Sequence, residues 1–176
     1  VAKFIKDEVN KPSAKQGHVV VEVKATSLNP IDHKLLKGDL GINPALPGIL
    51  HMDVSGVITE VGKGVTAFKT GDEIYGCAGG LQGEAGNIEG ALADFMLADS
   101  NLIALKPKSL SFSESAALPL VTITAWEGLF DRAHVKKEDH VLIHGGTGGV
   151  GHIAIQLAKQ HGARVATTVS SEEKAK

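Results

Sequence analysis

The sequence has little cysteine, little net charge and no long apolar run, and each shortage excludes a class of protein. Cys77 is the one cysteine among 176 residues, so an internal disulfide is excluded, as is typical of a reducing cytosol. No apolar run approaches the roughly 20 residues that cross a bilayer, and the first residues show no secretory signal pattern. We therefore expect a cytoplasmic protein with no membrane partner.

The charged residues nearly balance, with 18 Lys and Arg against 20 Asp and Glu and a formal net charge of −2. Hydrophobic residues make up 43% of the chain and charged residues 22%, which is typical of a soluble globular protein. Without a basic excess, nothing indicates a nucleic-acid partner or an anionic membrane surface. The length suffices for one or two domains with a substantial core.

Glycine is abundant, and its most informative cluster lies near the end of the chain. Residues 141–143 are a short apolar run that predicts a buried strand. Residues 146–151 then fit the pattern G-x-G-x-x-G, and an apolar stripe at helical spacing follows. Gly162 stands where a glycine ends a helix, and residues 164–169 are rich in Val and Thr. The order predicts a strand, a glycine turn, a helix and a second strand.

This order is the signature of a dinucleotide-binding turn and is much more specific than the glycine pattern alone. Glycines permit the tight bend, let the backbone approach a pyrophosphate and let the helix pack closely on the sheet. The helix N-terminus then offers free N–H groups and a positive dipole end to the phosphates. We therefore predict six cofactor-binding residues: Gly146, Thr147, Gly148, Gly149, Val150 and Gly151. The alternative is a glycine-rich turn that holds no ligand.

The first two thirds of the chain predict short strands separated by glycine turns, a pattern typical of a small, partly closed β-barrel. The expected strands cover residues 19–25, 54–61, 73–75, 91–98 and 102–105. Residues 31–37 predict a short helix that ends at Gly38. Residues 41–50 and 79–90 are expected to be loops, because the first contains two prolines and the second is rich in glycine.

The pattern changes near residue 115. Ser111 and Glu114 have the spacing of a helix capping box, and the run after them is helical by period but interrupted at Pro119. We therefore predict a barrel domain at residues 1–115 and an α/β domain at residues 116–176. The second would hold only the first part of a doubly wound fold, so we expect the sequence to be a fragment of a longer protein.

A series of motifs runs through nearly the whole chain. They are Asn29-Pro-Ile-Asp32, Asp53-Val-Ser-Gly-Val-Ile58, Val61-Gly62, Phe68-Lys-Thr-Gly-Asp72, Gly90-Ala-Leu-Ala-Asp-Phe95, Ala116-Ala-Leu-Pro119, Thr124-Ala-Trp126 and the glycine turn. Together they resemble the medium-chain dehydrogenase/reductase superfamily, and within it the zinc-free, ζ-crystallin-like quinone oxidoreductases. The resemblance implies a fold of class α/β plus β, in which a GroES-like, partly closed β-barrel precedes a Rossmann dinucleotide-binding domain.

The resemblance implies an oxidoreductase that transfers a hydride from NADPH to quinones or α,β-unsaturated carbonyls without zinc. The cofactor carries the chemistry, while the protein aligns donor and acceptor and stabilises the developing oxyanion. One alternative of the same architecture is an enoyl-thioester reductase, acting on CoA or carrier-protein thioesters. Another is a relative that binds NADPH without turnover. The partner would be a small-molecule substrate, and the family implies a homodimer of the full-length protein.

Zinc-containing members of this superfamily carry a cysteine ligand where this chain has Asn29 and a histidine ligand where it has Met52. The four cysteines of a structural zinc lobe are missing as well. The remaining combinations are His51 with Asp53 and His33 with Asp32. Neither supplies the set of converging ligands that catalytic zinc needs. We therefore expect no metal.

The end of the second predicted strand bears on the choice of cofactor. NAD enzymes usually carry an acidic residue there, which binds the ribose 2′-hydroxyl. Here residues 167–171 hold no acid, whereas Ser170, Ser171 and Lys174 would favour a 2′-phosphate. The resemblance also implies NADPH at the matching lysine, so we predict NADP(H). The alternatives are that one of the two preceding glutamates binds the ribose and that Lys174 is a solvated helix residue.

The resemblance places two further residues at the nicotinamide, and both are our candidate catalytic residues. Thr124 matches a threonine whose hydroxyl approaches the ring, and the Asn29 amide would bind the carboxamide or the substrate carbonyl. Otherwise Thr124 is a helix hydroxyl and Asn29 a turn residue. Asp32 and Asp53 are expected to brace loops. Because neither a metal nor a general acid is evident, we expect water or a cofactor hydroxyl to supply the proton. A tyrosine that lies near the substrate in many relatives is missing here, so the resemblance does not fix the substrate contacts.

Overall fold

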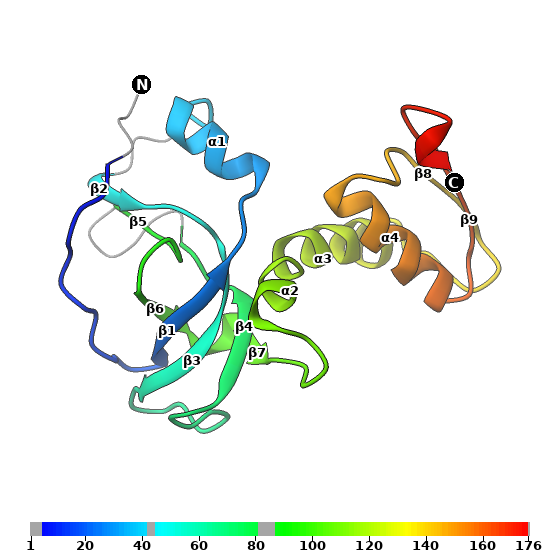
Figure 1. Cartoon of the computed structure of the whole chain (residues 1–176). Helices are drawn as coiled ribbons and strands as arrows, with labels where there is room; N and C mark the ends of the chain where they lie inside the picture. The colour runs from blue at the N-terminus through cyan, green and yellow to red at the C-terminus, as the bar shows by residue number, and fades with distance from the viewer. Residues whose placement is uncertain (1–4, 42–44, 81–86, 176) are drawn as a thin grey trace. The chain divides into compact units, whose positions relative to one another are not determined.

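The computed structural model of the chain describes residues 5–41, 45–80 and 87–175. The chain divides into two compact units, Val1–Pro119 and Leu120–Lys176, called unit 1 and unit 2 below. Figure 1 shows strands wound around a core in unit 1, and helices packed beside a short sheet in unit 2. Within the described residues, no helix is long and apolar enough to cross a membrane.

Unit 1 is built on a five-stranded antiparallel sheet in the order β6-β1-β3-β4-β7. Its strands are β1 (His18–Thr26), β3 (Asp53–Val61), β4 (Glu73–Cys77), β6 (Phe95–Asp99) and β7 (Ile103–Leu105). A second, parallel pair joins β2 (Ala45–Ile49) to β5 (Asn87–Glu89). The helical elements of this unit are α1 (Pro30–Lys37), the 3-10 turn η1 (Ser100–Leu102) and α2 (Phe112–Ala116). This arrangement is the partly open barrel that the sequence predicts.

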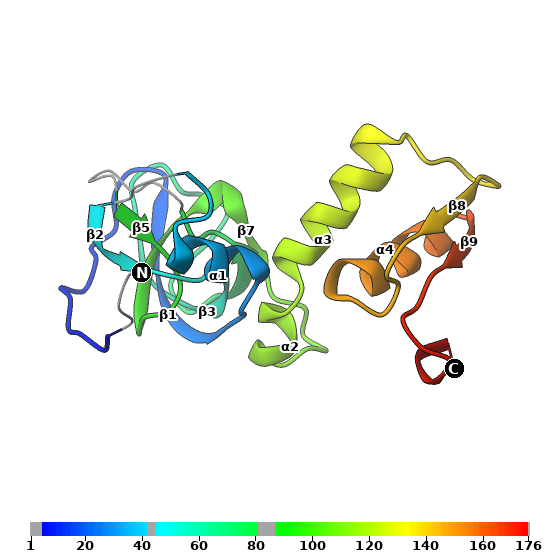
Figure 2. The ribbon, with the colours of Figure 1, turned by 90° about the horizontal axis from the view of Figure 1, so that it is seen from above.

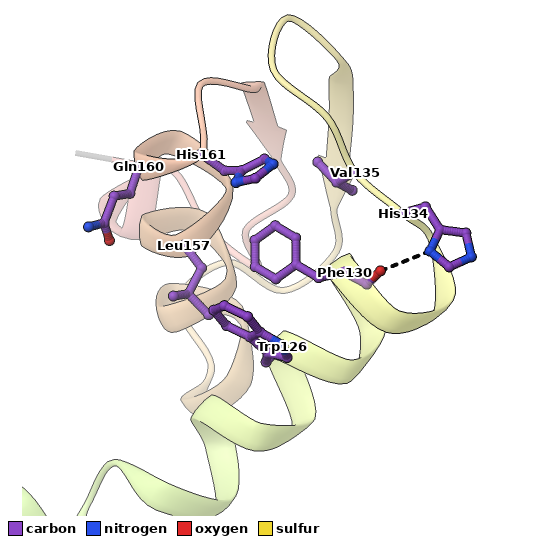
Figure 3. Close-up of a pocket in the computed structure, with 7 residues that line it drawn as sticks. All are labelled: Trp126, Phe130, His134, Val135, Leu157, Gln160 and His161. Atoms are coloured by element: carbon purple, nitrogen blue, oxygen red, sulfur yellow. Dashed lines mark hydrogen bonds between the residues drawn. The ribbon is translucent and has the colours of Figure 1, made fainter.

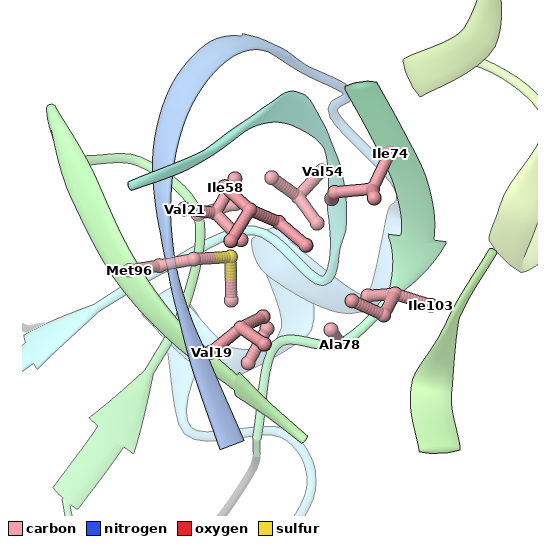
Figure 4. Close-up of a cluster of buried hydrophobic side chains, with 10 residues drawn as sticks. Val19, Val21, Val54, Ile58, Ile74, Ala78, Met96 and Ile103 are labelled. Atoms are coloured by element: carbon pink, nitrogen blue, oxygen red, sulfur yellow. The ribbon is translucent and has the colours of Figure 1, made fainter. Parts of the chain in front are cut away.

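The core of unit 1 consists of aliphatic side chains that the curved strands enclose (Figure 4). Val19 and Val21 point into this core from β1, as the alternation in the sequence predicts. Val20 lies outside that cluster but is also fully buried, and α2 contacts β1. Strand β1 is therefore an inner strand of the sheet, paired with β3 along one side and with β6 along the other.

Several predicted elements of unit 1 are confirmed, and two loops are corrected. Helix α1 ends at Gly38, whose φ of 75° lies in the left-handed region that glycine adopts freely. The loop predicted at 41–50 is wrong for Ala45–Ile49, and the loop predicted at 79–90 is wrong for Asn87–Glu89. These two segments pair with each other in an irregular register, and Glu89 also forms an isolated bridge with Gly80, so no alternation of side chains revealed them. Residues 42–44 and 81–86 lie outside the described residues.

Unit 2 contains the predicted strand, glycine turn, helix and strand. Helix α3 begins at Pro119, where the sequence predicts the interruption. The elements of this part are α3 (Pro119–Trp126), the π-helix η2 (Glu127–Arg132), β8 (His140–Ile143), α4 (Gly149–Gln160), β9 (Arg164–Thr167) and the 3-10 turn η3 (Glu173–Ala175). Strands β8 and β9 are parallel, and α4 packs along both (Figure 2). The carboxyl ends of the two strands therefore lie at the same edge.

Candidate functional site

The glycine turn between β8 and α4 is tightly folded because glycines let its segments approach each other. Gly145 has a φ of 70°. A Cβ atom on Gly146 would lie 2.2 Å from Oγ1 of Thr167, and one on Gly151 would lie 2.2 Å from the carbonyl oxygen of Gly145. No side chain fits at such distances, so the fold itself requires glycine at both positions.

Helix α4 presents an uncapped and exposed N-terminus. Its N-cap residue is Gly148, which makes no side-chain cap. The N–H groups of the first turn, residues 149–151, have no acceptor within the helix. Thr147, Gly148 and Gly149 are exposed, and Val150 is 37% exposed. Together with the positive end of the helix dipole, these N–H groups form a site suited to a phosphate or pyrophosphate.

The end of β9 is joined to the glycine turn by hydrogen bonds. The N–H of Gly146 donates to the carbonyl oxygen of Thr168 at 3.1 Å, and the N–H of Gly145 donates to Oγ1 of Thr168 at the same distance. Nδ1 of His144 lies 3.3 Å from this hydroxyl. Thr168 was not predicted as a site residue, although its place after β9 was a sufficient signal. Thr168 therefore holds the glycine turn against the end of β9, shortly before the predicted cofactor residues Ser170, Ser171 and Lys174.

Three exposed polar residues follow β9, as the sequence predicts. Nζ of Lys174 donates to Oγ of Ser170 at 3.2 Å, and Ser171 lies between them in the chain. An ammonium and two hydroxyls at one strand end offer several hydrogen-bond donors to an anion. The group fits a 2′-phosphate better than a bare ribose hydroxyl, for which a carboxylate would be the usual partner.

Thr124 lies on α3 and is exposed. Its hydroxyl donates to the carbonyl oxygen of Leu120, one turn earlier, at 2.8 Å. The hydroxyl hydrogen is therefore used within the helix, while the oxygen can still accept a hydrogen bond. Thr124 belongs to unit 2, whereas Asn29 belongs to unit 1.

Asn29 belongs to a buried polar cluster at the start of α1 and β3. Its Nδ2 donates to Oδ2 of Asp53 at 2.9 Å and to Oγ of Ser27 at 3.1 Å. Ser27 in turn donates to Oδ2 of Asp53 at 2.6 Å, and the Asn29 N–H donates to Oδ2 of Asp32 at 2.8 Å. Both carboxylates are fully buried, so they brace the loops around Asn29.

These contacts fix the orientation of the Asn29 amide, because a carboxylate can only accept. The Asn29 side chain also takes part in the capping box of α1, in which it accepts from the N–H of Asp32. Both Nδ2 hydrogens are used by Asp53 and Ser27, so the amide cannot donate to a substrate carbonyl, whereas Oδ1 has a second lone pair that can accept an N–H from a carboxamide. The geometry thus favours the first of the two roles expected for Asn29, the contact with the carboxamide.

Cys77 lies directly opposite Asp53, in the pairing of β4 with β3. Burial raises the pKa of its thiol to about 12, and the neighbouring carboxylates of Asp53 and Asp32 add to this effect. A protonated thiol is a poor metal ligand and a poor nucleophile. His33 is exposed on α1, whereas Asp32 is buried. Across residues 5–41, 45–80 and 87–175, no group of three or more His, Cys, Asp or Glu could hold a metal ion.

Unit 2 also has a shallow groove (Figure 3). Trp126 and Phe130 meet there edge to face, with ring centroids 4.7 Å apart. The lining residues are Trp126, Phe130, His134, Val135, Leu157, Gln160 and His161. None of them belongs to the glycine turn or to the end of β9, so the groove is separate from the candidate cofactor site.

Residues 15–108 match the family described as Alcohol dehydrogenase GroES-like domain. The chain is 39% identical over 170 residues to 2-methylene-furan-3-one reductase of Solanum lycopersicum, a match that covers 95% of this chain and 44% of that protein. It is also 41% identical to an alcohol dehydrogenase superfamily protein from Novosphingobium aromaticivorans, whose crystal structure it matches with a TM-score of 0.89 over 97% of this chain and 51% of that one.

A third relative is the quinone oxidoreductase of Escherichia coli, solved in complex with NADPH. The identity is 30% and the TM-score 0.81, over 96% of this chain and 49% of that chain. The chain thus spans about half the length of the relatives it matches.

Proposed function

Because the chain belongs to the medium-chain dehydrogenase/reductase superfamily, we propose that it works as a zinc-independent, NADPH-dependent oxidoreductase. We propose quinones or α,β-unsaturated carbonyls as its substrates. Relatives named for the reduction of a furanone and of quinones support this class, and one of them was solved with NADPH. The matched cysteine and histidine ligand positions are occupied by Asn29 and Met52, which supports a reaction without zinc.

The observation that carries the proposal is the exposed, uncapped N-terminus of α4, beside the donor group at the end of β9. The first turn of α4 would bind the pyrophosphate of the cofactor through the N–H groups of residues 149–151. Ser170, Ser171 and Lys174 would bind the 2′-phosphate. Both groups belong to unit 2 and are tied together through Thr168.

Asn29 and Thr124 complete the proposed assignments. Oδ1 of Asn29 would accept a hydrogen bond from the nicotinamide carboxamide through its second lone pair, and the exposed Thr124 hydroxyl oxygen would accept one from the cofactor. The bound cofactor would supply the hydride. The residues of the chain would hold its charged and amide groups in place, which raises the rate by orienting the reacting atoms.

A binding titration tests this proposal. The protein expressed from its natural reading frame is titrated with NADPH and with NADH, and the fluorescence of the nicotinamide is followed. We expect NADPH to bind at least about tenfold more tightly, a difference of about 1.4 kcal/mol. Equal affinities would contradict the role of Lys174, and no binding of either nucleotide would contradict the proposed function. A substrate panel that includes enoyl thioesters then separates the enone reductase from the thioester reductase.

A further inference from the structure

His51 has a backbone conformation that its residue type disfavours. Its φ is 72°, in the left-handed region, where a Cβ atom approaches the following carbonyl oxygen. Glycine would adopt this conformation without strain. Residues held in such a conformation cluster at sites where the side chain has a function.

The surrounding structure fixes this conformation from several sides. The N–H of His51 donates to Oδ1 of Asp32 at 3.1 Å, and its carbonyl oxygen accepts from the N–H of Ala91 at 2.8 Å. A Cβ atom on Gly79 or Gly90 would lie 2.4 Å or 2.5 Å from that oxygen, so both segments approach it as closely as glycine permits. The imidazole therefore projects from a rigid support.

The hydrogen bonds of Thr26 decide which ring nitrogen of His51 carries the hydrogen. Oγ1 of Thr26 donates its single hydrogen to the carbonyl oxygen of Asp53 at 2.6 Å. Nδ1 of His51 lies 3.2 Å from the same Oγ1, so the ring must donate through Nδ1–H. In the neutral ring Nε2 then carries the lone pair, and in the protonated ring Nε2–H is a donor.

Nε2 has no hydrogen-bond partner among the described residues, and His51 is only partly buried. Among the titratable groups of the neighbouring elements, Asp32 of α1 accepts from the His51 N–H, and Asp53 of β3 accepts from Thr26. Further along the sheets, Cys77 of β4 is paired with Asp53, and Glu89 of β5 is paired with Ile49. Thr26 and Asp53 also connect His51 to Asn29, the proposed carboxamide contact. A ligand group next to that contact would therefore lie beside a positioned imidazole.

We propose that His51 is the proton donor to the substrate oxygen, an inference that rests on the proposed function. The hydride would leave C4 of the bound nicotinamide, where a C–H bond breaks, and form a new C–H bond at the electrophilic carbon, while the π electrons of the substrate would move to its carbonyl oxygen. Nε2–H of the protonated ring is hydrogen-bonded to that oxygen and gives it the proton, so the N–H bond breaks as the O–H bond forms. The neutral imidazole regains a proton from water. This role replaces the water or cofactor hydroxyl expected from the sequence.

Two substitutions distinguish a proton-donor role of His51 from a structural role. Asn tolerates the left-handed region and places its amide nitrogen where the ring has Nδ1, so His51→Asn keeps the Thr26 contact and removes Nε2. His51→Gln places an amide N–H near the Nε2 position, but this group cannot release a proton. His134 is the matched control, because it also has a positive φ of 51° and its Nδ1 lies 3.0 Å from the carbonyl oxygen of Phe130.

The experiment measures kcat and KM for a quinone and an enone, together with the Kd for NADPH, in the protein expressed from its natural reading frame. We expect His51→Asn to lower kcat roughly 100-fold, the scale of a positioned general acid, without changing the Kd for NADPH. We expect His51→Gln to keep KM near its original value, to have an equally low kcat and to lose the pH dependence of kcat. His134→Asn should match the unsubstituted protein in every constant.

Three outcomes would overturn the proposal. A kcat for His51→Asn within twofold of the unsubstituted protein would show that Nε2 supplies no proton. A parallel loss of NADPH affinity or of folded protein in both His51 variants would assign the residue a structural role. Absence of turnover in the unsubstituted protein that still binds NADPH would overturn the proposed reductase activity and this inference with it.

Discussion

Nδ2 of Asn29 lies 2.9 Å from Oδ2 of Asp53, which joins the start of helix α1 to the start of strand β3. Both residues are buried, at 7% and 0% exposure. Because the carboxylate accepts only, it takes an N–H of the amide, and the amide oxygen remains as an acceptor, which the capping box of α1 uses for the N–H of Asp32. One structural contact thus decides which hydrogen bonds Asn29 can offer to a ligand.

Replacing Asp53 with Ala should lower the free energy of unfolding by about 3 kcal/mol. The change removes the acceptor of Ser27 Oγ and Asn29 Nδ2 and leaves those donors buried without it. Urea unfolding followed by circular dichroism measures the loss. Asp94→Ala is the control, because this side chain is exposed in the same unit, and it should change little. Equal stabilities of the two variants would show that the buried cluster contributes nothing.

Stability should fall as pH rises from about 9 to about 12, because the pKa of Cys77 rises from 9.0 to about 12 on folding. In that window the unfolded chain releases the thiol proton and the folded chain retains it, so unfolding is favoured by increasing pH. Below pH 9 both states keep the proton, and the contribution is fully present. Urea midpoints of Cys77→Ala and of the original protein, taken below and above pH 9, should converge as pH rises. Parallel pH dependences would contradict the raised pKa.

Gly151→Ala should abolish NADPH binding and destabilise unit 2, because the new Cβ would lie 2.2 Å from the carbonyl oxygen of Gly145. Gly149→Ala should retain the fold, since its Cβ meets only Cγ1 of Val121 at 3.4 Å. The fluorescence of Trp126, the single tryptophan, reports thermal unfolding of unit 2 in both variants. A Gly151→Ala variant that unfolds at the temperature of Gly149→Ala would refute the packing argument.

Lys174→Glu should reverse the preference between the two nucleotides. The ammonium donates to Ser170 and would pair with a 2′-phosphate, whereas a carboxylate there would repel the phosphate and accept from a ribose hydroxyl. We expect NADPH affinity to fall at least about tenfold, equivalent to about 1.4 kcal/mol, and NADH affinity to rise or stay the same. Isothermal titration with both nucleotides measures the change. Lys159→Glu, on the exposed side of α4, is the control and should leave both affinities unchanged.

The sequence predicted the elements that local rules determine. Ser111 accepts from the N–H of Glu114 and Glu114 accepts from the N–H of Ser111, which is the predicted capping box. Helix α4 followed from its apolar stripe, and its end from Gly162, whose φ is 92°. Each of these signals lies within a few neighbouring residues.

The features that the sequence did not reveal depend on distant partners. Strands β2 and β5 form through pairing with other segments, β2 with β5 and Glu89 of β5 also with Gly80, and no local pattern marks either strand. Thr26 and Ser27 reach Asp53 across more than 25 positions, which only the register of β1 against β3 brings together. The left-handed conformation of His51 was likewise unexpected, because the chain has no glycine at that position to announce it.

The most direct measurement of the central claim is the oxidation of NADPH by the protein expressed from its natural reading frame, followed by absorbance with a quinone and with an enone. We predict turnover with NADPH for at least one of these substrates, unchanged by a metal chelator and strongly reduced in the Gly151→Ala variant. Turnover that requires added zinc, or the absence of NADPH oxidation with both substrate classes, would contradict it.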